Sequence, residues 1–193
     1  RAMKLVSIPY QQIHKGSLIL VNEKYPCFQS DVKELIAIEG IMLERRTAIL
    51  LSKLMDEFEG WKYITAVSGW RSVSEQEEIY KNSILSNGEK FTEKYVAKPG
   101  HSEHQTGLAV DLGIRGVEND FIRPSFSDKG ATQVFKSKAA EFGFIERYPK
   151  GKESVTKIAY EPWHFRYVGV PHAAIMKERH LTLEEYTEFI KQE

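Results

Sequence analysis

The amino-acid sequence predicts an α+β fold, with a small, mainly antiparallel sheet and helices packed around it. Short stretches that alternate apolar and polar residues, as strands do, are interspersed with longer stretches whose apolar residues recur every three or four positions, as in helices. The turn-prone Pro149-Lys150-Gly151-Lys152 lies between two stretches of strand character, which favours a hairpin-like closure of the sheet. The chain has 193 residues, of which 41% are hydrophobic, and this suits one domain over residues 1–193 with a real core.

The N-terminal third is expected to hold a short strand and then a long helix. Leu18 to Val21 is a short apolar run of strand character. Asp31 followed by Glu34 indicates a helix start, and Gly60 indicates its end, with Gly40 as a position where the helix would bend or split. The apolar residues at helical spacing are Leu43, Leu50, Leu51, Leu54, Met55 and Phe58.

The middle of the chain is expected to run from a strand into a second helix. Tyr63 to Val67 alternates as a strand does, and Ser74 with Glu77 has the spacing of a capping box, which predicts a helix from Ser74 to Gly88. Residues 89–107 form a long polar connection. Because connections of this length are usually functional or disordered, we expect this one to wall a cleft.

The C-terminal half is expected to alternate strands with helices. The predicted strands cover residues 108–112, 144–148 and 161–168. One predicted helix covers residues 128–142 and is capped by Ser127, and a final helix is capped by Thr182 together with Glu185. Along the last strand, every second residue is aromatic, which indicates a face turned to the core: Trp163, Phe165 and Tyr167.

The composition excludes several classes of protein. Lys and Arg together number 27, as do Asp and Glu, so no net charge draws the chain to nucleic acid or anionic lipid. A single cysteine, Cys27, excludes an internal disulfide, and no run approaches 18 apolar residues. We expect a cytoplasmic protein that is a monomer or a homodimer. The chain begins Arg1-Ala2-Met3, so loss of an N-terminal anchor, which would place the domain on the outer face of the membrane, is the alternative.

One stretch carries the strongest chemical signal. Asp111 lies on an apolar strand. Because burial of an unpaired charge there would cost on the order of several kcal/mol, this carboxylate needs a partner. A cation shared with His104, seven residues upstream, is the expected partner. Gly107 tolerates unusual backbone angles and would let the chain turn between the two groups. His101 is a competing ligand at longer spacing.

A third candidate ligand, His164, lies far downstream. Two imidazoles, one carboxylate and an open fourth position are typical of catalytic zinc. Glu161 is a spare carboxylate close by that can take a proton from water. Because Pro162 lies between Glu161 and His164, a bend entering a strand is favoured over a helix.

Together these motifs resemble a known family. Ser102-x-His104-x6-Asp111, Glu161-x-x-His164 and Ser68-Gly69-Trp70-Arg71-Ser72-x3-Gln76 are similar to the motifs of zinc D,D-peptidases of the VanY and VanX type. The likeness runs from about Gly16 to Tyr167 and is strongest to the bifunctional D,D-dipeptidase/D,D-carboxypeptidases of the VanXY type, from vancomycin-resistance clusters. It implies the fold shared by D,D-peptidases and the hedgehog signalling domain, and one catalytic domain.

The resemblance also implies roles for the motif residues. His104, Asp111 and His164 would hold one zinc ion, Glu161 would act as general base, and Arg71 would stabilise the oxyanion. Ser102, Gln76 and Ser68 would bind substrate. We place His101 at the rim of the pocket or behind a metal ligand. From the sequence alone, the ordinary alternatives are a surface ion pair for Arg71 and a solvent-facing Gln76.

The implied substrate ends in D-Ala-D-Ala, either the free dipeptide or the tail of a peptidoglycan stem. Bifunctional relatives can carry an acidic residue where this chain has Ser68, which leaves the balance between these two substrates open. Two rival functions are a zinc-bearing binding module without activity and an endolysin-like peptidase that cuts an internal L-Ala-D-Glu bond. Retention of both Glu161 and Arg71 argues against the binding module, since a structural zinc needs neither.

Overall fold

A four-stranded sheet forms the centre of the computed structural model, which describes residues 16–27, 32 and 34–191. Its order is β3-β4-β6-β5, and every neighbouring pair is antiparallel. The strands are β3 (Ile64–Ser68), β4 (Ala109–Ile114), β6 (Glu161–Tyr167) and β5 (Phe144–Tyr148). A separate hairpin joins β1 (Leu35–Ile38) to β2 (Ile41–Glu44). With helices around it, this sheet confirms the predicted α+β class.

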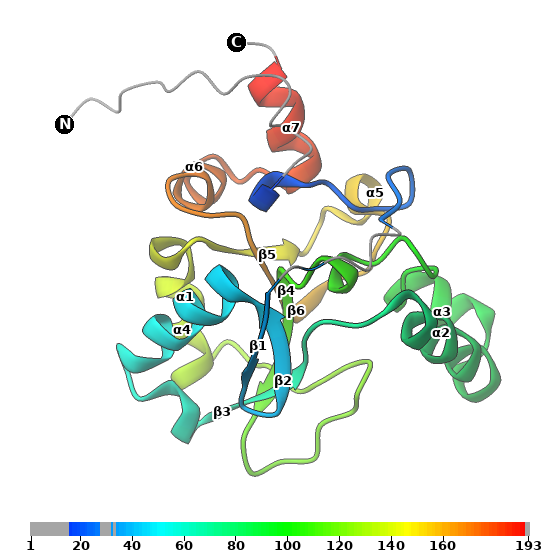
Figure 1. Cartoon of the computed structure of the whole chain (residues 1–193), viewed down its shortest axis with the longest axis horizontal. Helices are drawn as coiled ribbons and strands as arrows, with labels where there is room; N and C mark the ends of the chain where they lie inside the picture. Colours follow the sequence, from blue (N-terminus) through cyan, green and yellow to red (C-terminus); the bar gives the residue numbers. More distant parts are fainter. Residues whose placement is uncertain (1–15, 28–31, 33, 192–193) are drawn as a thin grey trace.

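Helices lie on several sides of the sheet (Figure 1). α1 (Arg45–Asp56) and α4 (Ala131–Lys138) lie together on one side, whereas α2 (Val73–Asn87) and α3 (Glu89–Tyr95) form a pair on the opposite side of the molecule. At one end, α6 (His172–Arg179) and α7 (Leu183–Lys191) follow β6. The shorter elements are α5 (Glu153–Thr156) and the 3₁₀ turns η2 (Gly16–Leu18), η3 (Gly60–Lys62), η4 (Glu103–Thr106) and η5 (Ala139–Phe142).

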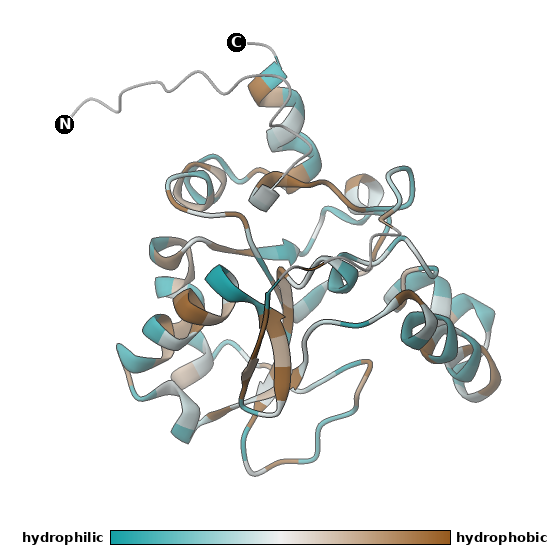
Figure 2. Ribbon diagram, in the orientation of Figure 1, coloured by the Kyte–Doolittle hydropathy of each residue, from teal (hydrophilic) through white to brown (hydrophobic). Residues whose placement is uncertain are grey.

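The main hydrophobic core lies between the sheet and α1. Leu51, Leu54 and Met55 of α1 are fully buried against strand residues such as Leu112 and Phe165. The aromatic face predicted for β6 belongs to this core, with Trp163, Phe165 and Tyr167 all buried. Figure 2 shows the consequence: hydrophobic residues gather on the central strands and on part of α1, while α2 and α3 are largely hydrophilic.

The predicted long helix is wrong in its first half, which forms the β1–β2 hairpin. The turn residues Glu39 and Gly40 have φ angles of 47° and 81°. Positive φ at both central residues gives a two-residue loop whose twist matches antiparallel strands, so the chain reverses at Gly40 instead of bending. The helix begins only at Arg45, capped by Glu44, and ends at Asp56, before the predicted Gly60. Of the predicted apolar stripe, Leu50, Leu51, Leu54 and Met55 lie on this helix, whereas Leu43 lies on β2 and Phe58 follows the helix end. Asp31, the predicted start, lies outside the described residues.

The predicted strand at Leu18–Val21 is also wrong, although its burial is right. Leu18, Leu20 and Val21 are buried, but the segment pairs with no strand among the described residues. Its backbone oxygens are taken by a side chain instead. Arg166 of β6 donates from Nη2 to the Ser17 and Ile19 carbonyls, at 2.8 and 2.7 Å.

Several other boundaries differ from those predicted. Ser72, not Ser74, caps α2 by accepting from the Glu75 amide at 3.1 Å. The polar connection after Gly88 contains α3 and η4, which were predicted as loop. α4 begins at Ala131, three residues later than predicted. α5 interrupts the link between β5 and β6, and α6 was not predicted.

The last helix is as predicted. Thr182 and Glu185 cap it reciprocally: the Thr182 amide donates to Glu185 Oε1 at 3.0 Å, and the Glu185 amide donates to Thr182 Oγ1 at 3.2 Å. In the part of the chain that is described, no helix has both the length and the apolar character needed to cross a membrane.

Candidate metal centre

Three neighbouring strands bring the predicted site together. In the sheet register, Ser68 at the end of β3 lies opposite Asp111 of β4, and Asp111 lies opposite His164 of β6. η4 then supplies His104. The chain turns from η4 into β4 at Gly107, whose φ of 75° is left-handed and whose Cα lies against the Glu44 backbone, where a side chain would crowd. The predicted turn at Gly107 is thus present.

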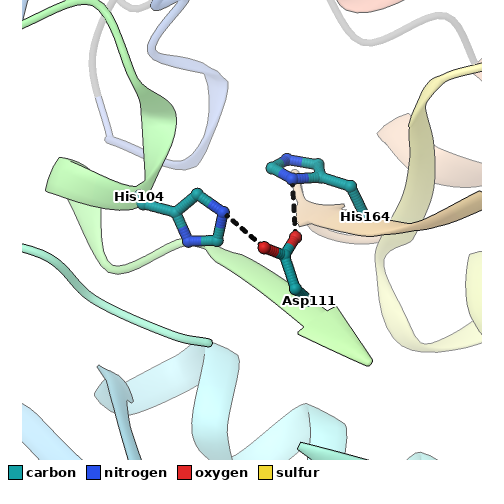
Figure 3. Close-up of side chains that lie close together, drawn as sticks. All are labelled: His104, Asp111 and His164. Atoms are coloured by element: carbon teal, nitrogen blue, oxygen red, sulfur yellow. Dashed lines mark hydrogen bonds and ion pairs between the residues drawn. The ribbon is translucent and has the colours of Figure 1, made fainter. Parts of the chain in front are cut away.

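His104, Asp111 and His164 converge on one point (Figure 3). The carboxylate of Asp111 lies between the two rings, 3.3 Å from His104 Nε2 and 2.9 Å from His164 Nδ1. All three candidate ligand atoms lie within 4.8 Å of one another, and all three residues are buried. The two rings stand nearly perpendicular, at 87°, so each presents a nitrogen edge to the shared space.

Hydrogen bonds on the far side of each ring fix which nitrogen faces the centre. His104 Nδ1 lies 2.7 Å from the Gly69 carbonyl oxygen, which can only accept, so Nδ1 carries the proton and Nε2 faces Asp111. His164 Nε2 lies 2.7 Å from Glu103 Oε1, which leaves Nδ1 facing Asp111.

This donor set fits a zinc ion. Two imidazole nitrogens and one carboxylate are the ligands of many catalytic zinc sites. Bonds of about 2.0–2.1 Å in a tetrahedron place neighbouring ligand atoms roughly 3.3 Å apart, close to the two separations from Asp111 to the rings. Without a cation, burial would raise the pKa of Asp111, but the imidazoles of His104 and His164 outweigh burial and hold that pKa well below its usual range. The site is therefore built around a carboxylate that stays charged.

Glu161 lies beside this set without belonging to it. Its Oε2 is 3.7 Å from His164 Nδ1, and the residue is 4% exposed. Burial raises the pKa of Glu161 well above its ordinary value, although the neighbouring His164 and Arg71 charges oppose that shift. A buried carboxyl group with a raised pKa can both accept and return a proton near neutral pH.

Arg71 is buried in the site and is not a surface ion-pair partner. Its guanidinium donates from Nε to Ser68 Oγ at 2.9 Å, from Nη1 to Gln76 Oε1 at 3.1 Å and from Nη2 to Asp111 Oδ2 at 3.2 Å. Gln76, only 1% exposed, is held in turn by the Ala97 carbonyl at 2.9 Å, so the solvent-facing alternative for Gln76 is wrong as well. Ser68 and Gln76 thus hold the guanidinium in a fixed direction.

A pocket that is partly open to solvent lies over the metal residues. Its polar wall includes Arg71, Gln76, Ser102 and Glu161. Its apolar wall comes from α2, from α3 and the residue after it, from the loop that follows β4, from the link between α5 and β6, and from β6 itself: Ile79, Tyr95, Val96, Ile122, Ile158 and Trp163. The segment after Gly88 therefore walls the cleft, as predicted, but partly as a helix. His101 does not line it: its Nδ1 contacts the Asn22 carbonyl oxygen at 2.9 Å, which corrects the expected place at the rim.

Sequence reasoning missed a group of buried charges behind His164. Glu103 contacts His164 on one side and both Arg147 and Arg166 on the other. Burial raises the pKa of Glu103, yet the charges of Arg147 and Arg166 outweigh that effect and hold the pKa far below its usual range. Arg166 could have been found, because it alternates with His164 on an otherwise apolar strand.

Two imidazoles, an aspartate, a spare buried carboxyl group and a buried guanidinium around one pocket define a mononuclear metal hydrolase. The comparison with known proteins narrows this class. Residues 41–170 match the family model described as VanY: D-alanyl-D-alanine carboxypeptidase. This match covers more than half of the chain, and the protein belongs to that family.

Individual relatives agree with that assignment. The bifunctional D-Ala-D-Ala dipeptidase and D-Ala-D-Ala carboxypeptidase VanXYC of Enterococcus gallinarum is 45% identical over 132 residues, which are 68% of this chain and 70% of that protein. The structure of the D,D-dipeptidase VanXYg with a D-Ala-D-Ala phosphinate analogue superposes with a TM-score of 0.90 at 47% identity, over 94% of this chain and 74% of that one.

A second solved structure bears on the metal. The VanY D,D-pentapeptidase of a VanB-type resistance cassette, in complex with Zn(II), is 32% identical with a TM-score of 0.73, over 88% of this chain and 98% of that one. Together with the geometry of His104, Asp111 and His164, this likeness identifies the cofactor of the present protein as zinc.

Proposed function

We propose that this protein is a zinc-dependent peptidase that hydrolyses the D-Ala-D-Ala bond, in the free dipeptide and at the end of peptidoglycan stem pentapeptides, and so contributes to glycopeptide resistance of the vancomycin type. The observation that carries the proposal is Glu161: a buried carboxyl group 3.7 Å from a metal-site imidazole but outside the donor set. A site that merely stores zinc has no use for such a group.

Each residue of the site would have its own role in the hydrolysis. His104, Asp111 and His164 would hold zinc, which supplies a Lewis acid that polarises the scissile carbonyl and lowers the pKa of a water to about 7. Glu161 takes the proton of the attacking water and passes it to the leaving amine. Arg71 donates hydrogen bonds to the carbonyl oxygen as it gains negative charge, a contribution of about 3–4 kcal/mol for such donors.

The contacts of the predicted substrate residues support a division between them. Ser102 and Gln76 line the pocket, and Arg71 donates hydrogen bonds to both Gln76 and Ser68. We therefore assign Ser102 to direct substrate binding, Gln76 to substrate binding both in the pocket and through the direction it gives Arg71, and Ser68 to substrate binding through Arg71. A cytoplasmic location and a monomeric or dimeric state belong to the same proposal, and cell fractionation and light scattering test them.

Product analysis tests the function. The zinc-loaded protein is incubated with D-Ala-D-Ala, with a stem pentapeptide and with intact cell wall, and the products are separated by mass spectrometry. Release of D-Ala from the first two, abolished by a chelator and by Glu161→Gln, is the expected result. New amino termini on D-Glu in the cell wall would establish the endolysin-like alternative, and zinc binding with no product from any substrate would establish the binding module.

A further inference from the structure

Glu103 lies at the centre of a buried network that ends on a metal-site residue. Its side chain is 0% exposed. One oxygen, Oε1, is 2.7 Å from His164 Nε2. The other, Oε2, accepts from Arg147 Nε at 2.9 Å and from Arg166 Nη1 at 3.0 Å. Both arginine side chains are also 0% exposed, so three charged groups are removed from water at this point.

This arrangement dictates the state of the His164 ring. A carboxylate beside two guanidinium groups stays ionised and can only accept hydrogen bonds. His164 therefore carries a proton on Nε2 and donates it to Glu103. With Nε2 committed to Glu103, Nδ1 is the nitrogen left to bind a metal ion, and it faces Asp111 at 2.9 Å. His104 has the opposite arrangement, with its proton on Nδ1 toward the Gly69 carbonyl oxygen.

The network continues from Glu103 to the last helix. Arg147 donates from Nη1 and Nη2 to the two oxygens of Glu184 on α7, at 2.7 and 2.8 Å. Asn22 donates to Glu184 Oε2 at 3.1 Å. A guanidinium and a carboxylate joined by two parallel hydrogen bonds fix each other's orientation as well as pairing their charges. Segments distant in the sequence thus meet behind the metal centre.

We propose that Glu103 is a positioning residue for the zinc site, which fixes the tautomer and direction of His164, and that Glu184 of α7 holds Glu103 in place through Arg147. Buried ion pairs are weak evidence for stability by themselves, because desolvation offsets their attraction. A buried group of charges is useful where it orients another side chain. Here that side chain is a metal ligand, and mutation of the outer hydrogen-bond partner of such a ligand typically lowers metal affinity or activity by about 10- to 100-fold.

The first test measures zinc affinity, independently of any substrate, in three variants. Competition with a chelating dye should show binding weakened by about 10- to 100-fold in Glu103→Gln, and weakened in the same direction but less in Glu184→Gln. Glu185→Gln is the matched control. Glu185 neighbours Glu184 on α7 but binds Lys152 and the Thr182 amide instead, so the zinc affinity of this variant should equal that of the wild type. Wild-type affinity in a folded Glu103→Gln protein would overturn the proposal.

A second measurement avoids variants, because Glu103→Gln leaves two buried arginines short of a counter-charge and can unfold. Nitrogen NMR of zinc-loaded, ¹⁵N-histidine-labelled wild type reads the tautomers directly. We expect zinc on Nδ1 of His164, with a downfield, exchange-protected Nε2 proton, and zinc on Nε2 of His104. Zinc on the same nitrogen of both rings, or an unprotected His164 proton, would overturn the inference. The proposal rests on the zinc site of the proposed function, yet either result stands whichever peptide is cleaved.

Discussion

Glu161 and His164 come from one strand, but only the imidazole belongs to the donor set. Gln at position 161 keeps the shape of the side chain and cannot accept a proton, so Glu161→Gln is expected to keep zinc and fold while kcat falls by about 100- to 10,000-fold. Zinc content by elemental analysis and steady-state kinetics on D-Ala-D-Ala check both halves. A fall in kcat of less than about tenfold would mean that another group is the base.

Arg71 allows a sharper test, because a guanidinium and an ammonium carry the same charge in different shapes. Three donors of Arg71 are engaged in three directions, and lysine cannot reproduce that planar fork. Arg71→Lys should therefore lower kcat and kcat/KM together, the mark of an interaction made in the transition state. Arg45→Lys, at an exposed ion pair with Glu34, should leave the kinetics unchanged. A raised KM with kcat unchanged would instead assign Arg71 to the substrate carboxylate.

Side-chain type and spacing pointed to His104, Asp111, Glu161 and His164, and the family resemblance was needed to prefer His104 to His101 and to place Arg71 in the site. Glu103 was missed for a physical reason. Its partners Arg147 and Arg166 lie on separate strands, and which charges meet depends on strand register, which a single sequence does not encode locally.

At the scale of elements, the junction between β2 and α1 is the clearest case of a cap that outweighs a pattern. Glu44 accepts from the Thr47 amide at 3.1 Å and from the Thr47 hydroxyl at 3.0 Å. Burial raises the pKa of Glu44, but these hydrogen bonds outweigh it and leave the pKa below its ordinary 4.5. The charged form is therefore favoured in the folded state, and the cap contributes stability above the ordinary pKa.

Glu44→Ala should accordingly lower the free energy of unfolding by about 1 kcal/mol at pH 7. The difference from wild type should shrink as the pH falls below about 4.5, because a protonated Glu44 caps less well. Urea denaturation at a series of pH values measures this. Glu77→Gln, at an exposed pair with Lys81, is the control and should show no comparable cap-dependent loss. A difference that stays constant down to pH 3 would contradict the assignment.

Elements with a repeated pattern were predictable, and those that depend on a single turn were not. The apolar stripe of α1 identified the second half of a helix, but the same apolar residues before it suit a hairpin once Glu39 and Gly40 turn the chain. Leu18 to Val21 has strand composition, yet it pairs with no strand among the described residues, and Arg166 binds the Ile19 carbonyl within it and the Ser17 carbonyl before it.

At the scale of the whole molecule, zinc and folding should be linked. His104, Asp111 and His164 come from η4, β4 and β6, and meet only in the folded chain, so zinc binds the native state selectively. At a free zinc concentration 100 times the Kd, native stability should rise by about 2.7 kcal/mol, or roughly 5–10 °C in Tm for a domain of this size. Differential scanning calorimetry with and without a chelator measures the shift.

The control for that link is a protein that cannot bind zinc. His104→Ala and His164→Ala should show no Tm difference between zinc and chelator, and elemental analysis should find them without stoichiometric metal. Full zinc occupancy in both variants would remove the metal assignment.

The class of fold was predictable at this scale because alternating and helical patterns are visible in the sequence. The packing of α6 and α7 in a second hydrophobic cluster with Leu18 and Leu20 was not.

Gly69 lies between the β1–β2 hairpin and the metal centre and contacts both through its backbone alone. Its carbonyl oxygen orients His104, and a Cβ atom on it would collide with the Met42 carbonyl oxygen, beside the hydrogen bond from the Trp70 amide to that same oxygen at 2.7 Å. The neighbouring hairpin backbone therefore restricts what can occupy this position. In a saturation library selected for survival on a glycopeptide, we expect position 69 to return glycine alone, as intolerant as a zinc ligand although it touches neither metal nor peptide.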